Sequence, residues 1–484
     1  MHSRQPGESR NESVAERGGH RPRVAQRAEY PPPRAPLPVV DAALHHSRCV
    51  IAALFGAPAE RTFDVRYWDG TTERGLAGSS RYVLAVNSRG ALRAMLLPPS
   101  ELSIIEAFLA GDIDVDGDLE AAVTIADEIS ERIRSPRTLA TAVRHLLALP
   151  RDAAVSGVRA ARAERIVRRL GREHDPPRDQ AAIRYHYDVG NDFYALWLDE
   201  RMVYSCAYFR SPSDSLEEAQ LAKLDLVCRK LRLRPGERFL DVGCGWGALV
   251  MHAAKHYGVT ALGITLSEAQ ASLARERIAA AGLSDRCRVE IRDYRDLPKP
   301  GSFDKIASVG MVEHVGRDKL PGYFASLYEA LAPGGSFLNH GIVSVAAARP
   351  AGWRERLEAR LWRRNAFMEQ YVFPDARLVP VHEVLAAAEG AGFETRDVES
   401  LREHYAMTLH AWLARLTTNA ARAIAATSTR TYRTWWLYMT GCAHAFATGR
   451  INVVQTLLSK PDAAGRAHLP LTREDLAVPL GSAR

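Results

Sequence analysis

The chain has 484 residues, of which 46% are hydrophobic and 25% are charged. This length excludes a small scaffold that depends on disulfides or metal ions, and the average composition excludes wholesale disorder, coiled coil and collagen. No apolar run is long enough to cross a bilayer, and the Arg- and Pro-rich start lacks the apolar stretch of a secretory signal, so we expect a cytosolic protein. The six cysteines form no CxxC pair, which favours reduced thiols over a zinc site or disulfides.

The net charge of +7 is concentrated in one segment. Residues 131–184 contain thirteen arginines against six acidic residues, a surplus equal to the charge of the whole chain. A basic segment of this kind can contact nucleic acid or an anionic membrane surface, and a solvated helix with counterions explains it equally well. Composition alone does not choose among the three.

The first part of the chain predicts a disordered basic tail over residues 1–45 and an α+β module over residues 46–149. The module shows no cluster of catalytic residue types. Its predicted elements, in chain order, are strands at Phe63–Trp68, Tyr82–Val86 and Leu92–Leu97 and helices at Glu101–Leu109 and Leu119–Ile129.

An acidic stretch inside this module imitates the start of a calcium-binding loop. Asp112, Asp114, Asp116 and Gly117 have the required spacing, but the twelfth position is Val123 and not the bidentate glutamate that such loops use. We therefore predict no metal here and interpret the stretch as a capped turn between helices.

An Arg-rich linker over residues 150–182 leads into a second domain over residues 183–484, where strand and helix patterns alternate. This alternation predicts an α/β fold with a doubly wound parallel sheet that is covered on both faces. The predicted strands are Arg238–Val242, Val259–Ile264, Cys287–Ile291, Lys305–Val309 and Ser336–His340, the last preceded by a turn at Leu331–Gly335.

The segment Asp241-Val-Gly-Cys-Gly-Trp-Gly247 lies between the first of these strands and a helical pattern at Ala248–His256. Its glycines allow a ligand to approach the backbone closely, but the GxGxG spacing and the lack of an acid after the second strand differ from the dinucleotide fingerprint. Asp241 would repel a pyrophosphate and suits a cationic amino acid. We therefore expect S-adenosylmethionine as ligand and a Rossmann-like class I methyltransferase fold.

Six motifs in chain order match the pattern of one known family. The sequence resembles the cyclopropane-fatty-acyl-phospholipid synthases, and the mycolic acid cyclopropane synthases related to them, strongly over residues 183–459 and loosely over the module before it. The motifs are His186-Tyr-Asp-Val-Gly-Asn-Asp192, Tyr204-Ser-Cys-Ala-Tyr-Phe209, Gly243-Cys-Gly-Trp-Gly247, Met311-Val-Glu-His-Val-Gly316, Tyr371-Val-Phe-Pro374 and Thr440-Gly-Cys-Ala443.

The resemblance implies an enzyme that transfers a methylene group from S-adenosylmethionine to the cis double bond of an acyl chain in phospholipid. An alkene is a weak nucleophile, so this chemistry requires close alignment in a dry pocket and a base that removes one proton from the transferred carbon. The resemblance implies that this base is a bicarbonate ion held by Cys206, Glu313, His340, Tyr405 and the backbone of Ile342.

These residues also have ordinary structural explanations. Cys206, His340 and Tyr405 taken singly would each be typical of a protein core, whereas Glu313 follows an apolar strand at the sheet edge where ligands bind. Cys442 matches another cysteine of the family's active site, although the chemistry requires no thiolate and no sequence neighbour lowers its pKa.

For S-adenosylmethionine, the resemblance implies contacts to the methionine part, the ribose and the adenine. Gln270 stands where an acid usually binds the ribose, and it still offers a hydrogen bond. The implied cofactor-binding residues are Tyr204, Ser205, Asp241, Gly243, Gly245, Gly247, Thr265, Gln270, Asp293 and Tyr294, with no metal.

We expect a lid insertion at about residues 343–375, in which residues 353–364 combine tryptophan with arginine as a membrane-surface helix does. The expected partners are unsaturated membrane phospholipid and an anionic membrane surface and not nucleic acid, with the protein at the inner face of the membrane and the module helping to engage lipid. A homodimer is one arrangement that the resemblance allows. Two alternatives stay open: a methyl- or methylene-branched product, and a lipid-binding protein that does not catalyse.

Overall fold

The protein is described by a computed structural model, which defines residues 41–123, 132, 135–152, 189–298, 300–345, 367–373 and 377–476. The chain divides into two units, Met1–Asp41 and Ala42–Arg484. Most of the predicted tail, nearly all of the Arg-rich linker and the predicted helix at residues 353–364 lie outside the described residues. Helix α1 begins at Ala42, so the last residues assigned to the tail belong to the module.

The N-terminal module contains a four-stranded sheet in the order β2-β1-β3-β4, in which β1 and β3 are parallel and the other pairs antiparallel. Its core is one apolar cluster in which the inner side chains of α1 and α6 meet the sheet. The strands are β1 Asp64–Tyr67, β2 Thr72–Glu73, β3 Tyr82–Val86 and β4 Ile113–Gly117, and the helices are α1 Ala42–Phe55, α2 Ala91–Leu96, α3 Glu101–Ala110, α4 Leu119–Val123 and α6 Pro136–Ala148, with a short 3-10 turn at Pro58–Glu60.

Two predictions for this module are wrong. The predicted strand Leu92–Leu97 is helix α2, because its buried side chains recur with helical spacing and the helix starts directly after Gly90. The acidic stretch is strand β4 and not a turn: Ile113 and Val115 face the core, while Asp114 and Asp116 lie on the other face beside arginines. Within the described ranges, no three potential ligands are arranged to hold a metal ion.

The second sheet has seven strands in the order β10-β11-β9-β8-β5-β6-β7. Strands β7, β6, β5, β8 and β9 are parallel, and β11 is antiparallel to both β9 and β10. The strands are β5 Arg238–Val242, β6 Thr260–Thr265, β7 Cys287–Ile291, β8 Phe303–Val309, β9 Leu331–Ser344, β10 Glu394–Ser400 and β11 Ile451–Ser459. All five predicted strands are confirmed, and the predicted turn Leu331–Gly335 is instead the irregular start of β9.

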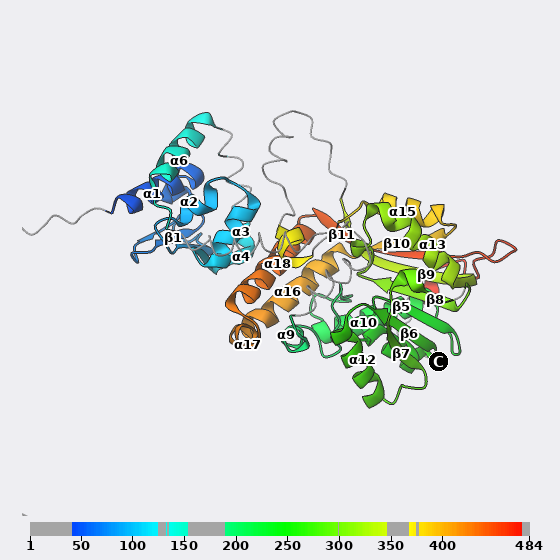
Figure 1. Cartoon of the computed structure of the whole chain (residues 1–484). Coiled ribbons are helices and arrows are strands. Elements are labelled where there is room, and N and C mark those ends of the chain that lie inside the picture. Colours follow the sequence, from blue (N-terminus) through cyan, green and yellow to red (C-terminus); the bar gives the residue numbers. More distant parts are fainter. Residues whose placement is uncertain are drawn as a thin grey trace, which may run out of the picture. The chain divides into compact units, whose positions relative to one another are not determined.

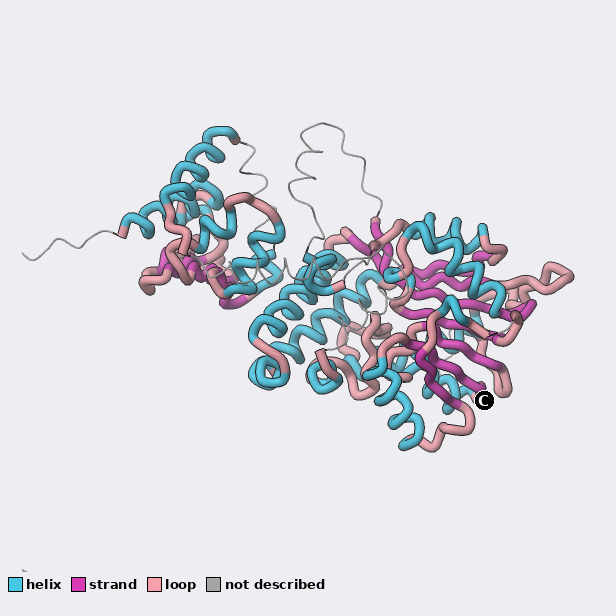
Figure 2. The backbone as a smooth tube through the Cα atoms, in the orientation of Figure 1, coloured by secondary structure: helices cyan, strands magenta, loops and turns pink. Residues whose placement is uncertain are grey.

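Helices cover both faces of this sheet, as Figures 1 and 2 show. Alternate residues of β5 face opposite sides: Leu240 and Val242 pack with α13 and α15, whereas Phe239 packs with α10, α11 and α12. The predicted doubly wound α/β fold is therefore confirmed. The helices are α9 Asn191–Ala195, α10 Leu216–Leu231, α11 Ala248–Tyr257, α12 Glu268–Ala280, α13 Leu320–Ala330 and α15 Val381–Gly390, with 3-10 turns at Tyr294–Asp296, Val312–His314, Arg317–Lys319 and Glu474–Leu476 and a π-turn at Met368–Val372.

Three C-terminal helices, α16 Arg402–Thr418, α17 Ala420–Ala426 and α18 Thr429–Ala447, add to the sheet domain, and Figure 1 shows α16 and α18 side by side. Their inner faces form one large aromatic cluster with α9 and the segment Met368–Val372. Among the described helices, none has the length and apolarity required to cross a membrane.

Candidate functional site

The glycine-rich loop after β5 forms the floor of a pocket. Gly243 and Gly245 have left-handed backbone angles, with φ of +82° and +54°, which side chains other than glycine rarely adopt. Added Cβ atoms would have no neighbour within 4 Å at Gly245 and would be 3.6 Å from Met311 at Gly243, so the space above the loop is open. The loop therefore suits a ligand that lies directly on the backbone.

Nine of the ten predicted cofactor-binding residues line this pocket; they are Tyr204, Ser205, Asp241, Gly243, Gly245, Thr265, Gln270, Asp293 and Tyr294. The exception is Gly247, which begins α11 with φ of +82°. A Cβ atom there would lie 3.2 Å from the Cβ of Ala274, so this glycine allows α11 to pack against α12.

The polar residues around the pocket are oriented by local bonds. The Thr265 hydroxyl donates to Gln270 Oε1 at 2.8 Å, which leaves the Gln270 amide N–H groups for a ligand. Asp293 instead accepts from the Arg295 guanidinium at 2.8 and 2.7 Å. The same Arg295 guanidinium lies over the ring of Tyr294, so Asp293 helps to position Tyr294 through Arg295.

A buried lysine that the sequence interpretation missed also lines the pocket. Lys223 of α10 is 2% exposed, and its ammonium donates to the Ser205 hydroxyl at 2.9 Å. Burial lowers the pKa of Lys223 to about 8 and raises the pKa of Asp241 to about 7. The available signal was a lysine at an inward position of a helix that is buried over most of its length.

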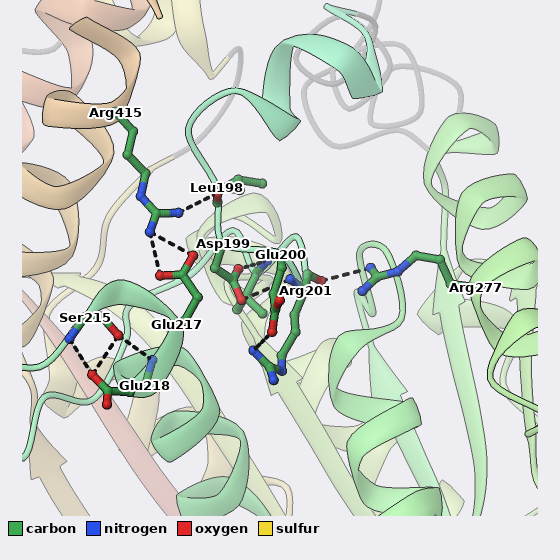
Figure 3. Close-up of polar contacts among 10 residues, drawn as sticks. Leu198, Asp199, Glu200, Arg201, Ser215, Glu217, Glu218, Arg277 and Arg415 are labelled. Carbon is green, nitrogen blue, oxygen red and sulfur yellow. Dashed lines mark hydrogen bonds and ion pairs between the residues drawn. The ribbon is translucent and has the colours of Figure 1, made fainter. Parts of the chain in front are cut away.

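The loop that carries Tyr204–Cys206 is fixed by the polar contacts in Figure 3. Asp199 accepts from the backbone N–H groups of Arg201 at 3.2 Å and Val203 at 2.8 Å. Arg277 of α12 donates to the Arg201 carbonyl at 2.9 Å. The Asp199 carboxylate and the Arg277 guanidinium thus provide hydrogen-bond partners for the backbone N–H and C=O groups of this loop. The loop therefore holds its residues rigidly against the pocket.

The same region joins α10 to α16. Arg415 of α16 donates to the Leu198 carbonyl at 2.9 Å and to both carboxylate oxygens of Glu217 in α10, as Figure 3 shows. Arg415 lowers the pKa of Glu217 by this hydrogen bonding. The helix that carries Lys223 is thereby fixed relative to the helix that carries Tyr405.

Glu313 lies in the turn after β8 and reaches the neighbouring strand β9. Its Oε1 accepts from the backbone N–H of Ile342 at 2.7 Å, and its Oε2 is buried without a partner in the described structure. The side chain is 7% exposed, and burial raises its pKa to about 7. The Ile342 N–H, which we predicted would hold bicarbonate, is thus bound to Glu313 in this structure.

His340 lies two residues before Ile342 on β9, and its side chain is directed to the same face of the sheet. Its Nδ1 accepts from the Gln455 amide at 3.1 Å, so the ring proton is on Nε2. Burial lowers the pKa of His340 to about 3, so the ring is neutral at physiological pH. The Nε2–H is buried and has no partner among the described groups.

Tyr405 is the residue around which the remaining predicted groups meet. Burial raises its pKa well above the ordinary value, and Tyr204, Cys206, Glu313 and Cys442 raise it further. These four groups therefore lie within electrostatic range of its hydroxyl. His340 lies on β9, two residues from the backbone N–H that binds Glu313.

The two cysteines of the predicted site, Cys206 and Cys442, are protonated thiols. Cys206 is completely buried and donates to the carbonyls of Ala207 and Leu401 at 3.3 and 3.7 Å. Burial raises the pKa of Cys206 and raises that of Cys442 to about 12. Neither thiol is therefore suited to act as a nucleophile.

Packed aromatic rings surround Tyr204 on the side of the C-terminal helices. Ring centroids of Tyr194, Trp197, Trp412 and Trp435 lie 5.4 to 6.1 Å from that of Tyr204. All four side chains are buried. The part of the pocket that Tyr204 lines thus borders a region that is apolar and closed to water.

Within the unit Ala42–Arg484, α3 of the module contacts the same aromatic region. The Tyr371 hydroxyl donates to the buried carboxylate of Glu106 at 3.0 Å. The ring of Phe108 stacks on Trp436 of α18, and Arg433 pairs with Asp114. The module is therefore packed directly against the segment that contains the Tyr371–Phe373 motif.

The comparisons with known proteins agree with this geometry. The family model for mycolic acid cyclopropane synthetase matches residues 174–456, and a model for a domain of unknown function matches residues 50–134. A Pseudomonas putida protein described as a probable fatty acid methyltransferase is 41% identical over 415 residues, 85% of this chain and 95% of that protein. Cyclopropane mycolic acid synthase 1 of Mycobacterium tuberculosis is 37% identical over 283 residues, 58% of this chain and 97% of that one.

Solved structures support the same relationship. The cyclopropane synthase MmaA2 of Mycobacterium tuberculosis has 34% identity and a TM-score of 0.53, and covers 58% of this chain with 97% of its own length. The mycolic acid cyclopropane synthase CmaA1, solved in complex with SAH and CTAB, has 36% identity and the same TM-score and coverage. Both similarities extend over fewer residues than the second domain, residues 183–484, contains.

Proposed function

Because the chain belongs to the cyclopropane synthase family of S-adenosylmethionine-dependent methyltransferases, we propose that it adds a methylene group to the cis double bond of an acyl chain in membrane phospholipid. S-adenosylmethionine supplies an electrophilic methyl group when it is bound. The olefin would take up this carbon as its bond to sulfur breaks and S-adenosylhomocysteine leaves, and loss of one proton from the same carbon would close the three-membered ring.

The pocket above the glycine loop fits this methyl donor. Gly243 and Gly245 leave room on the backbone, Gln270 offers amide donors for the ribose, and Asp241 suits an ammonium group. Asp241 Oδ1 is buried and has no partner in the described structure. A cationic ligand would supply the partner that a buried polar atom normally has. These residues would hold the adenosyl and amino acid parts.

The observation that carries the proposal is the buried Oε2 of Glu313, which has no partner in the described structure and lies within electrostatic range of Tyr405. A carboxylate whose pKa is about 7 can both accept and release a proton near neutral pH. Its other oxygen is fixed on the Ile342 N–H, so the free oxygen keeps one position. Glu313 is therefore suited to carry the proton away from the reacting carbon.

We propose that a bicarbonate ion occupies the space between these groups and removes the proton. His340 offers a buried Nε2–H and Tyr405 a hydroxyl, donors that suit a small anion, whereas the Cys206 thiol donates to backbone carbonyls in this structure. Glu313 would accept the hydroxyl proton of that anion. The orphaned Nε2–H of His340 supports this assignment, because a buried donor normally has a partner.

The apolar surroundings protect the cationic carbon that forms on the substrate. Water would trap this carbon before the ring closes, so the site must exclude water. The buried rings of Trp197, Trp412 and Trp435 beside Tyr204 would provide such exclusion. We propose that the acyl chain enters along this aromatic region.

We further propose that the N-terminal module helps to engage the membrane, which places the protein at the inner membrane face. The contact of α3 with the Tyr371 segment supports a role for the module close to the acyl site. The Arg-rich segment of residues 131–184 offers positive charge for an anionic membrane surface.

The test incubates the purified protein with S-adenosylmethionine, bicarbonate and vesicles of monounsaturated phospholipid. We expect the acyl chains to gain the mass of one CH2 group and to show the upfield proton resonances of a cyclopropane ring. Unchanged acyl chains would contradict the proposal. Omitting bicarbonate under CO2-free conditions should slow the reaction, and an unchanged rate would remove bicarbonate from the proposal.

The second candidate is methyl transfer that gives a methyl- or methylene-branched chain. The Pseudomonas putida relative, which is described as a probable fatty acid methyltransferase, favours this candidate. A hydride shift before proton loss would produce the branch from the same first step. Because a methylene branch has the mass of the ring, the NMR spectrum of the product distinguishes the two.

A further inference from the structure

Lys223 is a buried cation without a full set of partners. Among the described residues, its ammonium donates to the Ser205 hydroxyl at 2.9 Å but forms no ion pair with a carboxylate. Lys230, two helical turns later in α10, is equally buried but pairs with Glu399 and, at 3.7 Å, with Asp397. Buried ammonium groups are normally paired, because leaving them unpaired is costly.

The position of Lys223 indicates what completes it. It lines the pocket together with Asp241, whose Oδ1 is also buried without a described partner. The pocket therefore presents one positive and one negative buried group on the side where Tyr204 and Ser205 lie. This pattern is complementary to a zwitterion, in which a carboxylate and an ammonium share one carbon.

We propose that Lys223 binds the carboxylate of the amino acid end of S-adenosylmethionine, a role that rests on the proposed function. Because the Ser205 oxygen accepts from Lys223, the hydroxyl proton of Ser205 is directed away from the ammonium and donates to the same carboxylate. Asp241 receives the ammonium of the ligand. Lys223 thus selects ligands that retain the whole amino acid over those that carry adenosine alone.

The test compares two ligands on the full-length protein by calorimetry. S-adenosylhomocysteine carries the amino acid end, and 5′-methylthioadenosine shares the adenosine and the thioether but lacks it. In the Lys223→Met variant, which keeps the length of the side chain, we expect S-adenosylhomocysteine to bind about 10- to 100-fold more weakly, as removing a hydrogen bond to a charged group predicts. Binding of 5′-methylthioadenosine should not change.

Lys230→Met is the matched control. It removes a buried lysine from the same helix, so it should reduce stability without changing either affinity. If Lys223→Met leaves S-adenosylhomocysteine binding intact, or weakens both ligands equally, the assignment of Lys223 is wrong. If the wild-type protein binds neither ligand, the methyl donor in the proposed function is wrong.

A second measurement needs no variant. Decarboxylated S-adenosylmethionine keeps the sulfonium and the amino group and lacks only the carboxylate. The wild-type protein should bind it about 10- to 100-fold more weakly than S-adenosylmethionine. Equal affinities would overturn the proposal even if Lys223→Met failed to fold.

Discussion

The carboxylate of Glu313, in the turn Val312–His314 after β8, accepts a hydrogen bond at 2.7 Å from the backbone N–H of Ile342 near the C-terminal end of β9. The bond requires Gly341 between them, because a Cβ atom there would lie 2.2 Å from Val312 and 3.7 Å from Glu313 Oε2. A turn and a strand therefore fix one carboxylate oxygen and leave the other facing the site. This arrangement makes Glu313 a positioned acid–base group.

Replacing Glu313 by glutamine should stop catalysis without affecting the cofactor. The amide oxygen can keep the Ile342 bond, but the side chain can no longer take up a proton. We expect turnover to fall about 100- to 10,000-fold, the usual contribution of a general acid–base group. Affinity for S-adenosylhomocysteine should not change. Glu389→Gln, an exposed change in α15, is the control, and equal turnover of the two variants would contradict the role of Glu313.

The same variant predicts a change of stability with pH. Burial raises the pKa of Glu313 from 4.5 to about 7, so the folded protein binds this proton more tightly than the unfolded chain. The resulting stabilisation is present below pH 4.5 and is lost as the pH rises through 7. Relative to wild type, Glu313→Gln should therefore gain about 2 to 4 kcal/mol in its free energy of unfolding between pH 4.5 and 8.

Denaturant unfolding at several pH values measures this gain. Asp241, whose pKa is also raised to about 7, is present in both proteins, so its contribution cancels in the difference. A difference between the two proteins that stays constant with pH would show that Glu313 ionises as it does in water.

Gln455 should determine which nitrogen of His340 carries the proton. Its amide donates to Nδ1 at 3.1 Å and so keeps the Nε2–H directed into the site. In Gln455→Glu a carboxylate would accept from Nδ1–H, so the proton of the neutral ring would move from Nε2 to Nδ1. The negative charge would also raise the pKa of His340 from about 3. Nitrogen-15 NMR of histidine-labelled protein checks both effects, with the exposed His410 as internal control. An unshifted His340 signal would contradict the assignment.

The sequence predicted the parallel strands well because buried parallel strands are nearly continuous apolar runs, as in the Ala261–Ile264 part of β6. It failed at Ala91–Leu96, since an apolar run this short fits helix and strand equally. Whether a single site residue could be identified depended on how far along the chain its partners lie. The motifs identified Glu313 and His340, whereas Lys223 was missed because its meaning comes from Ser205, which lies in a different segment.

The contacts of His340 could not be predicted for the same reason. Its partner Gln455 lies in β11, an antiparallel strand that was not predicted, and the two residues are paired across the sheet. Short-range patterns define elements, but a hydrogen bond between residues more than a hundred positions apart depends on the register of two strands. Only the folded chain determines that register.

The buried bond between Glu106 and Tyr371 should couple the N-terminal module to catalysis. Tyr371 belongs to the segment in which Phe373 packs against Tyr438, and the Tyr438 hydroxyl accepts a hydrogen bond at 3.4 Å from the hydroxyl of Tyr204, which lines the cofactor pocket. A change at Glu106 can therefore reach the methyl donor through contiguous side chains. We expect Glu106→Leu and Tyr371→Phe each to lower both stability and turnover.

A double-mutant cycle isolates this pair from the other contacts of each residue. Glu106→Leu combined with Tyr371→Phe should show a coupling of about 1 to 3 kcal/mol in unfolding, as a buried hydrogen bond to a charged group predicts. The exposed Glu120–His410 contact at 2.9 Å, which also joins the module to a C-terminal helix, is the matched control and should show less than about 1 kcal/mol. If turnover is additive in the first cycle while unfolding is not, the module stabilises the fold without influencing the reaction.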